Sequence, residues 1–245
     1  MKKRIVLFAS VLMLSNLACS FVSQLVEGDA PVAEPLPVIE VEPVQPEPIQ
    51  PEPTAISEHA SNILFEDDFS DTSSGWDRNQ DEDGLTDYYN GGYQIQVNSD
   101  NLFIFANPGL TNLPNDVRIE VDATKQGGSD DNSFGILCRY QDVSNFYRFI
   151  VTSDGYAGIL LVKDGSGLSL NGVNLTPINA ALAGNVTNKI RVNCIGHTLS
   201  LFVNGEQVLT AQDSTFSNGD VGVFAGTFDI VGTDILFDNF VVTRP

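Results

Sequence analysis

Basic residues are scarce in this sequence of 245 residues. It contains 12 Lys and Arg against 32 Asp and Glu, which gives a formal net charge of −20 at pH 7. Nucleic acids and anionic membrane surfaces are bound through clustered Lys and Arg. The deficit argues against both as partners, whereas an acidic surface suits solubility, cations and neutral ligands such as glycans.

Common catalytic signatures are also absent. There are only two histidines, His59 and His197, and His197 falls in a predicted hairpin turn. The sequence contains no G-x-S-x-G, H-E-x-x-H or P-loop pattern. These absences argue against catalysis.

Long hydrophobic runs are missing except near the N-terminus. Basic residues 2–4 precede the apolar stretch "IVLFASVLMLSNLA" and Cys19. This is the layout of a secretory signal, and it is too short for a membrane-spanning helix. Ala18 and Cys19 resemble the end of a bacterial lipobox, although Asn16 stands where that motif has an aliphatic residue. We predict a signal peptide over residues 1–18 and lipidation of Cys19, with ordinary secretion as the alternative.

Residues 19–61 are predicted to form a disordered tether. From residue 20 they include eight acidic residues and no Lys or Arg, and "PVAEPLPVIEVEPVQPEPIQPEPT" contains eight prolines. Proline fixes φ and lacks an amide donor, so this stretch suits neither a helix nor a sheet. We expect an extended spacer of roughly 3 Å per residue that holds an extracytoplasmic domain away from the membrane.

Helical periodicity is absent beyond the signal, and residues 62–245 show short alternating runs instead. The expected strands are "YQIQV", "LFIFA", "VRIEVDAT", "SFGILCRY", "FYRFIVT", "YAGILLVK", "KIRVNCI", "LSLFVNG", "EQVLTA", "DVGVFAG" and "DILFDNFVVT". Asp154-Gly155, Asp164-Gly165 and Asn204-Gly205 suit tight hairpin turns with positive φ. This pattern predicts one all-β domain, an antiparallel jelly-roll sandwich.

Alternation also assigns side chains to faces. In "DVRIEVDAT" the inward set is Val117, Ile119, Val121 and Ala123, and the outward set is Arg118, Glu120 and Asp122. The same parity groups Cys194 with Ile190 and Val192, and Cys138 with Phe134, Ile136 and Tyr140. Both cysteines therefore point inward. In an exported domain they are expected to form one disulfide, closing a loop of roughly 55 residues; two buried free thiols are the alternative.

Five stretches carry a family resemblance. They are "FEDDFSDTSSGWDR", "VRIEVDATK", "NSFGILCRYQDVSNFYRFIVTSDGYAGILLVKDG", "IRVNCIGHTLSLFVNGEQV" and "DILFDNFVV". Over residues 64–243 the chain resembles the concanavalin A-like lectin/glucanase sandwiches, in particular the LamG-like and 3-keto-disaccharide-hydrolase-like domains of exported bacterial proteins. The resemblance implies the sandwich fold, and by analogy carbohydrate binding or hydrolysis.

Glu120 and Asp122 are the candidate catalytic residues. Glycosidases generally use two carboxylates, and hydrolytic members of the resembled superfamily often carry Glu-x-Asp-x-x-Glu along one strand. Here "EVDATK" supplies the first two acids, but Thr124 and Lys125 stand where the second Glu is needed. An acid elsewhere in the chain would have to complete the pair; otherwise Glu120 and Asp122 are ordinary surface residues.

The acidic stretch "NQDEDGLTDYYN", residues 79–90, has part of the spacing of a calcium loop. Counted from Asn79, positions 3, 5, 6 and 9 are Asp81, Asp83, Gly84 and Asp87. Ca²⁺ requires such oxygen ligands, but position 12 is Asn90 rather than Glu and no helices flank the loop, which excludes an EF-hand. A second acidic turn offers Asp130, Asp131 and Asn132. The resemblance implies one Ca²⁺ that orders loops of the domain; solvated turns are the alternative.

Aromatic residues near the first acidic turn suggest a sugar platform. Exposed rings stack on the apolar faces of sugars. Trp76, Tyr88 and Tyr89 are the carbohydrate-binding candidates; the alternative is that Trp76 and Tyr93 belong to the core, Tyr93 on the face of Ile95 and Val97.

The sequence thus predicts a lipid-anchored, lectin-like module that binds glycan at a bacterial cell surface without cleaving it. One alternative is a glycoside hydrolase or related sugar-processing enzyme that depends on Glu120 or Asp122. The other is a structural lipoprotein whose partner is a surface protein. The missing second Glu separates the first two hypotheses, and nothing in the sequence separates the first from the third.

Overall fold

The computed structural model describes residues 62–172 and 175–245, which belong to one compact unit of the chain. The predicted signal peptide, Cys19 and the tether lie outside the described residues. Within the described part every regular element is a β-strand, and no helix there is long and apolar enough to cross a membrane.

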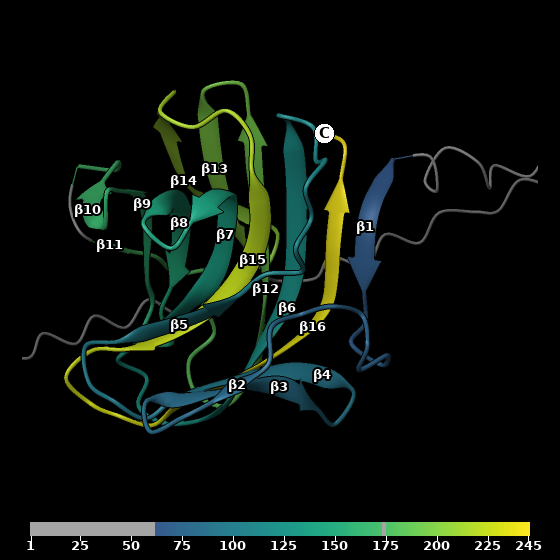
Figure 1. Cartoon of the computed structure of the whole chain (residues 1–245). Helices are drawn as coiled ribbons and strands as arrows, with labels where there is room; N and C mark the ends of the chain where they lie inside the picture. The colour runs from purple at the N-terminus through teal and green to yellow at the C-terminus, as the bar shows by residue number, and fades with distance from the viewer. Residues whose placement is uncertain (1–61, 173–174) are drawn as a thin grey trace, which may run out of the picture. The chain divides into compact units, whose positions relative to one another are not determined.

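Two antiparallel sheets make up the domain (Figure 1). The first has the order β14-β13-β12-β6-β16-β4-β3-β2, with β1 also paired to β16. Its strands are β1 (Ile63–Asp67), β2 (Asn79–Gln80), β3 (Gly84–Tyr89), β4 (Gly92–Val97), β6 (Val117–Gly127), β12 (Thr187–Ile195), β13 (Thr198–Val203), β14 (Glu206–Gln212) and β16 (Thr233–Thr243).

The second sheet has seven strands in the order β10-β9-β8-β7-β15-β5, with β11 paired to β9. Its strands are β5 (Phe103–Ala106), β7 (Asn132–Asp142), β8 (Asn145–Val151), β9 (Tyr156–Lys163), β10 (Ser166–Ser169), β11 (Thr176–Pro177) and β15 (Asp220–Thr227). Figure 1 shows β10 and β1 at opposite ends of the domain. The predicted jelly-roll sandwich is confirmed, and each expected strand is present.

The hairpin turns follow the predicted chemistry. Both residues of Asp164-Gly165 and of Asn204-Gly205 have positive φ, whereas in Asp154-Gly155 only the glycine does. Positive φ at both central residues matches the right-handed twist of the flanking strands, which is why Asn or Asp followed by Gly is favoured there.

The core lies between the sheets and is built by alternation. Val117, Ile119, Val121 and Ala123 of β6 are buried in it, and the residues between them are half-buried on the outer side. Cys138 of β7 and Cys194 of β12 form a disulfide that joins the two sheets across this core. The predicted disulfide is therefore confirmed, with a sequence separation of 56 residues.

The predicted parity of Tyr140 is wrong. Arg139 has a φ of 53°, and the pairing of β7 with β8 and β15 shifts at this point. Such a bulge reverses the direction of the following side chain, so Tyr140 packs against the outer side of its sheet. Arg139 itself is 2% exposed and donates hydrogen bonds to the carbonyl oxygens of Asn115, Gly196 and Phe216.

Candidate functional site

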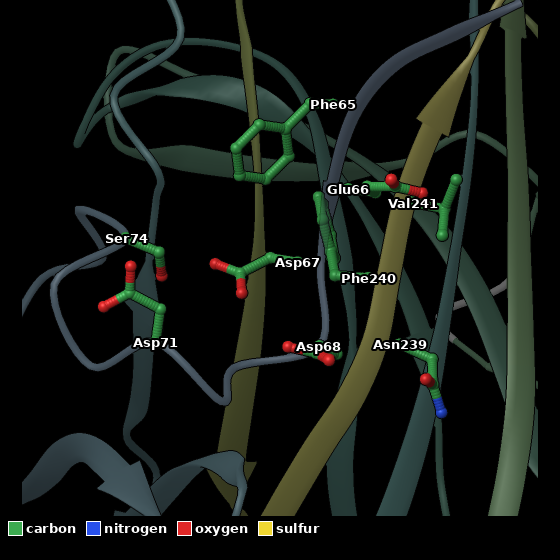
Figure 2. A pocket seen from close by; sticks show the side chains of 9 residues that line it. All are labelled: Phe65, Glu66, Asp67, Asp68, Asp71, Ser74, Asn239, Phe240 and Val241. Carbon is green, nitrogen blue, oxygen red and sulfur yellow. The ribbon is translucent and has the colours of Figure 1, made fainter. Parts of the chain in front are cut away.

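An acidic pocket lies where β16 changes its partner from β4 to β1 (Figure 2). The change of partner coincides with Asn239, which has a φ of 52° and interrupts the pairing of β16 with β6. The pocket has a volume of about 560 Å³. Its lining residues are Phe65, Glu66, Asp67, Asp68, Asp71, Ser74, Asn239, Phe240 and Val241.

The carboxylates of this pocket do not converge. Asp67 is buried and accepts hydrogen bonds from Trp76 Nε1 at 2.9 Å and Phe69 N at 2.7 Å, whereas Glu66 points to the other side of β1 (Figure 2). Hydrogen bonds from the serines two residues further along the chain lower the pKa of Asp68 and of Asp71. A general acid needs a raised pKa. Asp68 and Asp71 therefore do not have the raised pKa of a general acid, and their hydrogen bonds hold the local turns.

The predicted calcium residues are engaged with other groups. Asp81 Oδ1 accepts hydrogen bonds from the backbone N–H groups of Asp83 and Gly84 and closes the turn between β2 and β3. Asp87 pairs with Arg78 at 2.7 Å.

In the second acidic turn, the carboxylate that is engaged is that of Asp130. Asp130 pairs with Lys125, and the backbone N–H of Asp131 donates to Ser129 Oγ. In residues 62–172 and 175–245, no group of three or more His, Cys, Asp and Glu is arranged to hold a metal ion. Calcium binding stays a prediction.

The predicted sugar platform does not form as one surface. Trp76 is 3% exposed and packs against Phe69 and Phe240, so the prediction that it binds sugar is wrong. Tyr88 and Tyr89 lie within β3 rather than in a loop, and adjacent strand residues point to opposite sides. Tyr88 faces the core and its hydroxyl accepts from the backbone N–H of Trp76, while Tyr89 is 49% exposed.

Glu120 and Asp122 share the outer side of the nine-stranded sheet, as predicted. Glu120 lies 4.0 Å from Lys189 Nζ, and Asp122 accepts a hydrogen bond from Asn239 Nδ2 at 3.0 Å. Lys125, at the position of the missing Glu, is buried. Position 125 therefore supplies no second carboxylate to Glu120 and Asp122.

A second candidate site lies on the outer side of the seven-stranded sheet, opposite the main core. Four of its strands, β5, β7, β8 and β15, contribute to what we call the aromatic face. The aromatic face consists of Phe103, Phe105, Tyr140, Phe146, Arg148 and Phe224. Phe146 and Phe224 are fully buried beneath the half-buried Phe103, Phe105 and Tyr140.

Ring packing gives the aromatic face a continuous surface. The centroid of Phe105 lies 5.5 Å from that of Tyr140 and 6.0 Å from that of Phe146. The residue of β7 opposite Phe224 is Gly135. A Cβ there would lie 3.2 Å from the Phe224 ring and 2.0 Å from the Phe149 carbonyl oxygen, so glycine makes room for this packing.

Arg148 is the cation of the aromatic face. Its cross-strand neighbours are Leu137 and Leu160, and its guanidinium lies 4.3 Å from the Phe103 ring centroid and 5.4 Å from that of Phe224. Burial alone lowers the pKa of Arg148 from its usual range to about 10. An acid close to Arg148 would act in the opposite direction.

A pocket of about 390 Å³ adjoins the aromatic face at Tyr140. Gln141, Asn218 and Asp220 supply polar groups to its lining. Burial is the main cause that raises the pKa of Asp220, and the nearby charge of Asp77 adds to it. The pocket thus places amides and a carboxylate with a raised pKa beside an aromatic ring.

The sequence prediction missed the aromatic face, although a signal was present. In "FYRFIVT" the residues Phe146, Arg148 and Ile150 alternate with a second apolar set, Tyr147, Phe149 and Val151. A strand that is apolar on both sides is covered on both sides, and a cation within such a pattern needs an explanation.

The architecture is that of the concanavalin A-like jelly-roll sandwiches. No protein-family model and no curated protein matches the sequence. Among solved structures, a carbohydrate-binding module, CBM66 from Bacillus subtilis, superposes with a TM-score of 0.56 and 19% identity over 69% of this chain and 96% of the other.

Two further structures superpose on the chain. A Bacillus subtilis protein of unknown function with a galectin-like fold has a TM-score of 0.52 and 10% identity, covering 75% of this chain and 96% of the other. The catalytic domain of an endo-1,3-beta-glucanase (laminarinase) from Thermotoga petrophila has a TM-score of 0.51 and 10% identity, covering 74% and 97%. At these identities the shared property is the fold.

Proposed function

We propose that the described domain binds carbohydrate on the aromatic face without cleaving it. The observation that carries this proposal is a half-buried aromatic surface that includes Arg148 and adjoins a polar pocket at Tyr140. Aromatic rings stack on the apolar faces of sugars, and the amides of Gln141 and Asn218 suit their hydroxyl groups. A fold neighbour that is itself a carbohydrate-binding module supports the assignment by analogy.

The test is a glycan array probed with the full-length chain, followed by titration of the glycans that bind. Tyr140→Ala should weaken binding by about tenfold, because it removes one stacking ring. Tyr89→Ala is the matched control, since Tyr89 is an exposed tyrosine of the other sheet. Absence of binding to any glycan, or dependence on Tyr89 instead of Tyr140, would contradict the proposal.

Running the array with calcium and with a chelator tests the calcium prediction. Binding that disappears in the chelator would assign the ion a part in recognition, and the acidic turns at Asp81 and Asp130 would then be examined first. Binding in both conditions would make the aromatic face sufficient.

A second candidate function is glycoside hydrolysis. The observation that favours it is the place of Asp220 in the lining of the pocket beside Tyr140, where burial raises its pKa in the direction that a general acid requires. Release of reducing ends from a bound glycan, abolished in Asp220→Asn, would support hydrolysis; binding without such release supports the first proposal.

We also propose that the protein is a lipoprotein held outside the cytoplasm by a lipid on Cys19, which lies outside the described residues. The apolar stretch before Cys19 and the proline-rich segment after it support this proposal. Cys19→Ser should move the protein from the membrane fraction to the soluble fraction. Continued retention in the membrane fraction would contradict lipidation.

A further inference from the structure

Arg148 has donors that the domain does not use. Within the described residues its side chain donates no hydrogen bond and forms no ion pair, and the side-chain Nε is buried without a partner. Arg148 as a whole is half-buried, so part of its side chain remains in contact with solvent. A guanidinium stacked on a ring keeps its N–H groups in its own plane, where they remain free to donate.

Among residues 62–172 and 175–245, the side chains found against Arg148 include no carboxylate. Facing strands β7 and β9 present Leu137 and Leu160, and the rings next to it are Phe103 and Phe224. The ionisable group of the aromatic face besides Arg148 is Tyr140, whose pKa is raised chiefly by burial and further by Asp142, Asp77 and Asp220. Those acids lie toward the Tyr140 end, and burial is the sole cause that shifts the pKa of Arg148.

Leaving a partly desolvated cation unpaired costs free energy. The chain has a net charge of −20 and therefore many carboxylates, yet none of them pairs with Arg148 in the described residues. The arrangement is explained if the missing partner arrives with the ligand. A carboxylate or sulfate oxygen pair matches the fork of a guanidinium, and the aromatic rings beside it suit the apolar face of a sugar.

We propose that Arg148 makes the aromatic face selective for anionic saccharides, in which an acidic group on the sugar binds the guanidinium while the ring stacks beside it. This inference rests on the proposed carbohydrate binding and goes further, because it names the chemical class of the ligand. The two sources of the anion, a uronic-acid carboxylate and a sulfate ester, share the same recognition chemistry.

The experiment measures binding of the full-length chain to tetrasaccharides of galacturonic, glucuronic and mannuronic acid, each as free acid and as methyl ester. Esterification removes the charge and keeps the ring. The free acid should bind at least about tenfold more tightly than its ester, since the ester cannot form the hydrogen-bonded charge pair with Arg148. A sulfated galactan tetrasaccharide and its desulfated form make the second arm, which distinguishes sulfate from carboxylate.

Arg148→Gln should remove the preference for the acid, and Arg148→Lys should restore only part of it because Lys lacks the planar fork. Arg191→Gln is the matched control. Arg191 lies on the other sheet, where its guanidinium is 3.8 Å from the Phe202 ring centroid and its Nε also lacks a partner. Unlike Arg148, it has a glutamate, Glu120, as a cross-strand neighbour. Circular dichroism and thermal melting of each variant verify that the fold is retained.

The outcomes separate this inference from the proposed function. An acid preference, for carboxylate or sulfate, that depends on Arg148 and not on Arg191 supports it. Equal binding of acid and ester, or an acid preference that survives Arg148→Gln, overturns it while leaving carbohydrate binding intact. If neutral and anionic saccharides alike fail to bind, both proposals fall.

Discussion

The outer side of each sheet carries an arginine stacked on a phenylalanine ring, but the neighbours of the two arginines differ. On the seven-stranded sheet Arg148 lies over Phe103, and on the nine-stranded sheet Arg191 lies over Phe202. Arg191 has Glu120 as its cross-strand neighbour, whereas the cross-strand neighbours of Arg148 are leucines.

The difference separates a solvated outer side on the nine-stranded sheet from an apolar outer side on the seven-stranded sheet, which we propose binds a ligand. The nine-stranded sheet alternates apolar and polar residues, which is the pattern of a sheet with one solvated side. On β8 and β15 both sides are apolar, so the outer side resembles a second core from which one cation reaches the surface. Three predictions test whether this difference in packing and charge affects the stability of the domain.

The largest expected effect concerns packing. Phe224→Ala should lower the free energy of unfolding by about 3–5 kcal/mol, because Phe224 is fully buried although it lies on an outer side. Phe202→Ala, its counterpart on the nine-stranded sheet, should cost about 1 kcal/mol because Phe202 is half-buried and little apolar area is lost. Denaturation in urea measures both. Equal losses would show that the two outer sides are packed alike.

An intermediate effect concerns the two arginines. Arg148→Met should raise the free energy of unfolding by about 1–3 kcal/mol, because it replaces a desolvated, unpaired charge with an apolar side chain of similar length. Arg191→Met, next to Glu120, should leave stability nearly unchanged. The same urea experiment decides, and a destabilised Arg148→Met protein would mean that the guanidinium contributes to folding rather than to binding.

The smallest expected effect compares the two sides of β8. Tyr147, on the inner side, is fully buried, and burial followed by its hydrogen bond to Asp213 raises its pKa from 10 to about 12. The folded state therefore favours the neutral phenol, and this stabilisation is present below pH 10 and is lost as the pH rises toward 12.

Wild-type protein should lose about 1 kcal/mol of stability between pH 9 and 11 from this residue, and Tyr147→Phe should lose correspondingly less over the same interval. Urea denaturation at both pH values measures the difference. Tyr89→Phe is the control, because Tyr89 is exposed on the other sheet. An unchanged pH response of Tyr147→Phe would mean that the phenol is not held neutral.

The sequence predicted what depends on the local chain. Strand positions, hairpin turns and the inward parity of Cys138 and Cys194 all follow from alternation and turn chemistry, which involve residues close together in the chain. The prediction for Tyr140 failed because a bulge at Arg139 shifts the register by one residue, and no local pattern marks it. The prediction for Trp76 failed because its indole finds an acceptor in Asp67 within the core.

The aromatic face depended on tertiary structure for a different reason. Phe103, Phe146 and Phe224 come from β5, β8 and β15, which lie far apart in the sequence, and the sheet brings them together because β15 pairs with β5 and with β7, the neighbour of β8. Local alternation determines which side of its own strand a residue takes; the order of the strands determines its neighbours. The leucines beside Arg148 lie on β7 and β9, its neighbours along the chain, but Phe103 and Phe224 reach it from β5 and β15. Likewise the pairing of β6 with β12, strands far apart in the sequence, places Glu120 opposite Arg191, because such cross-strand contacts are set by the folded sheet and not by spacing along the chain.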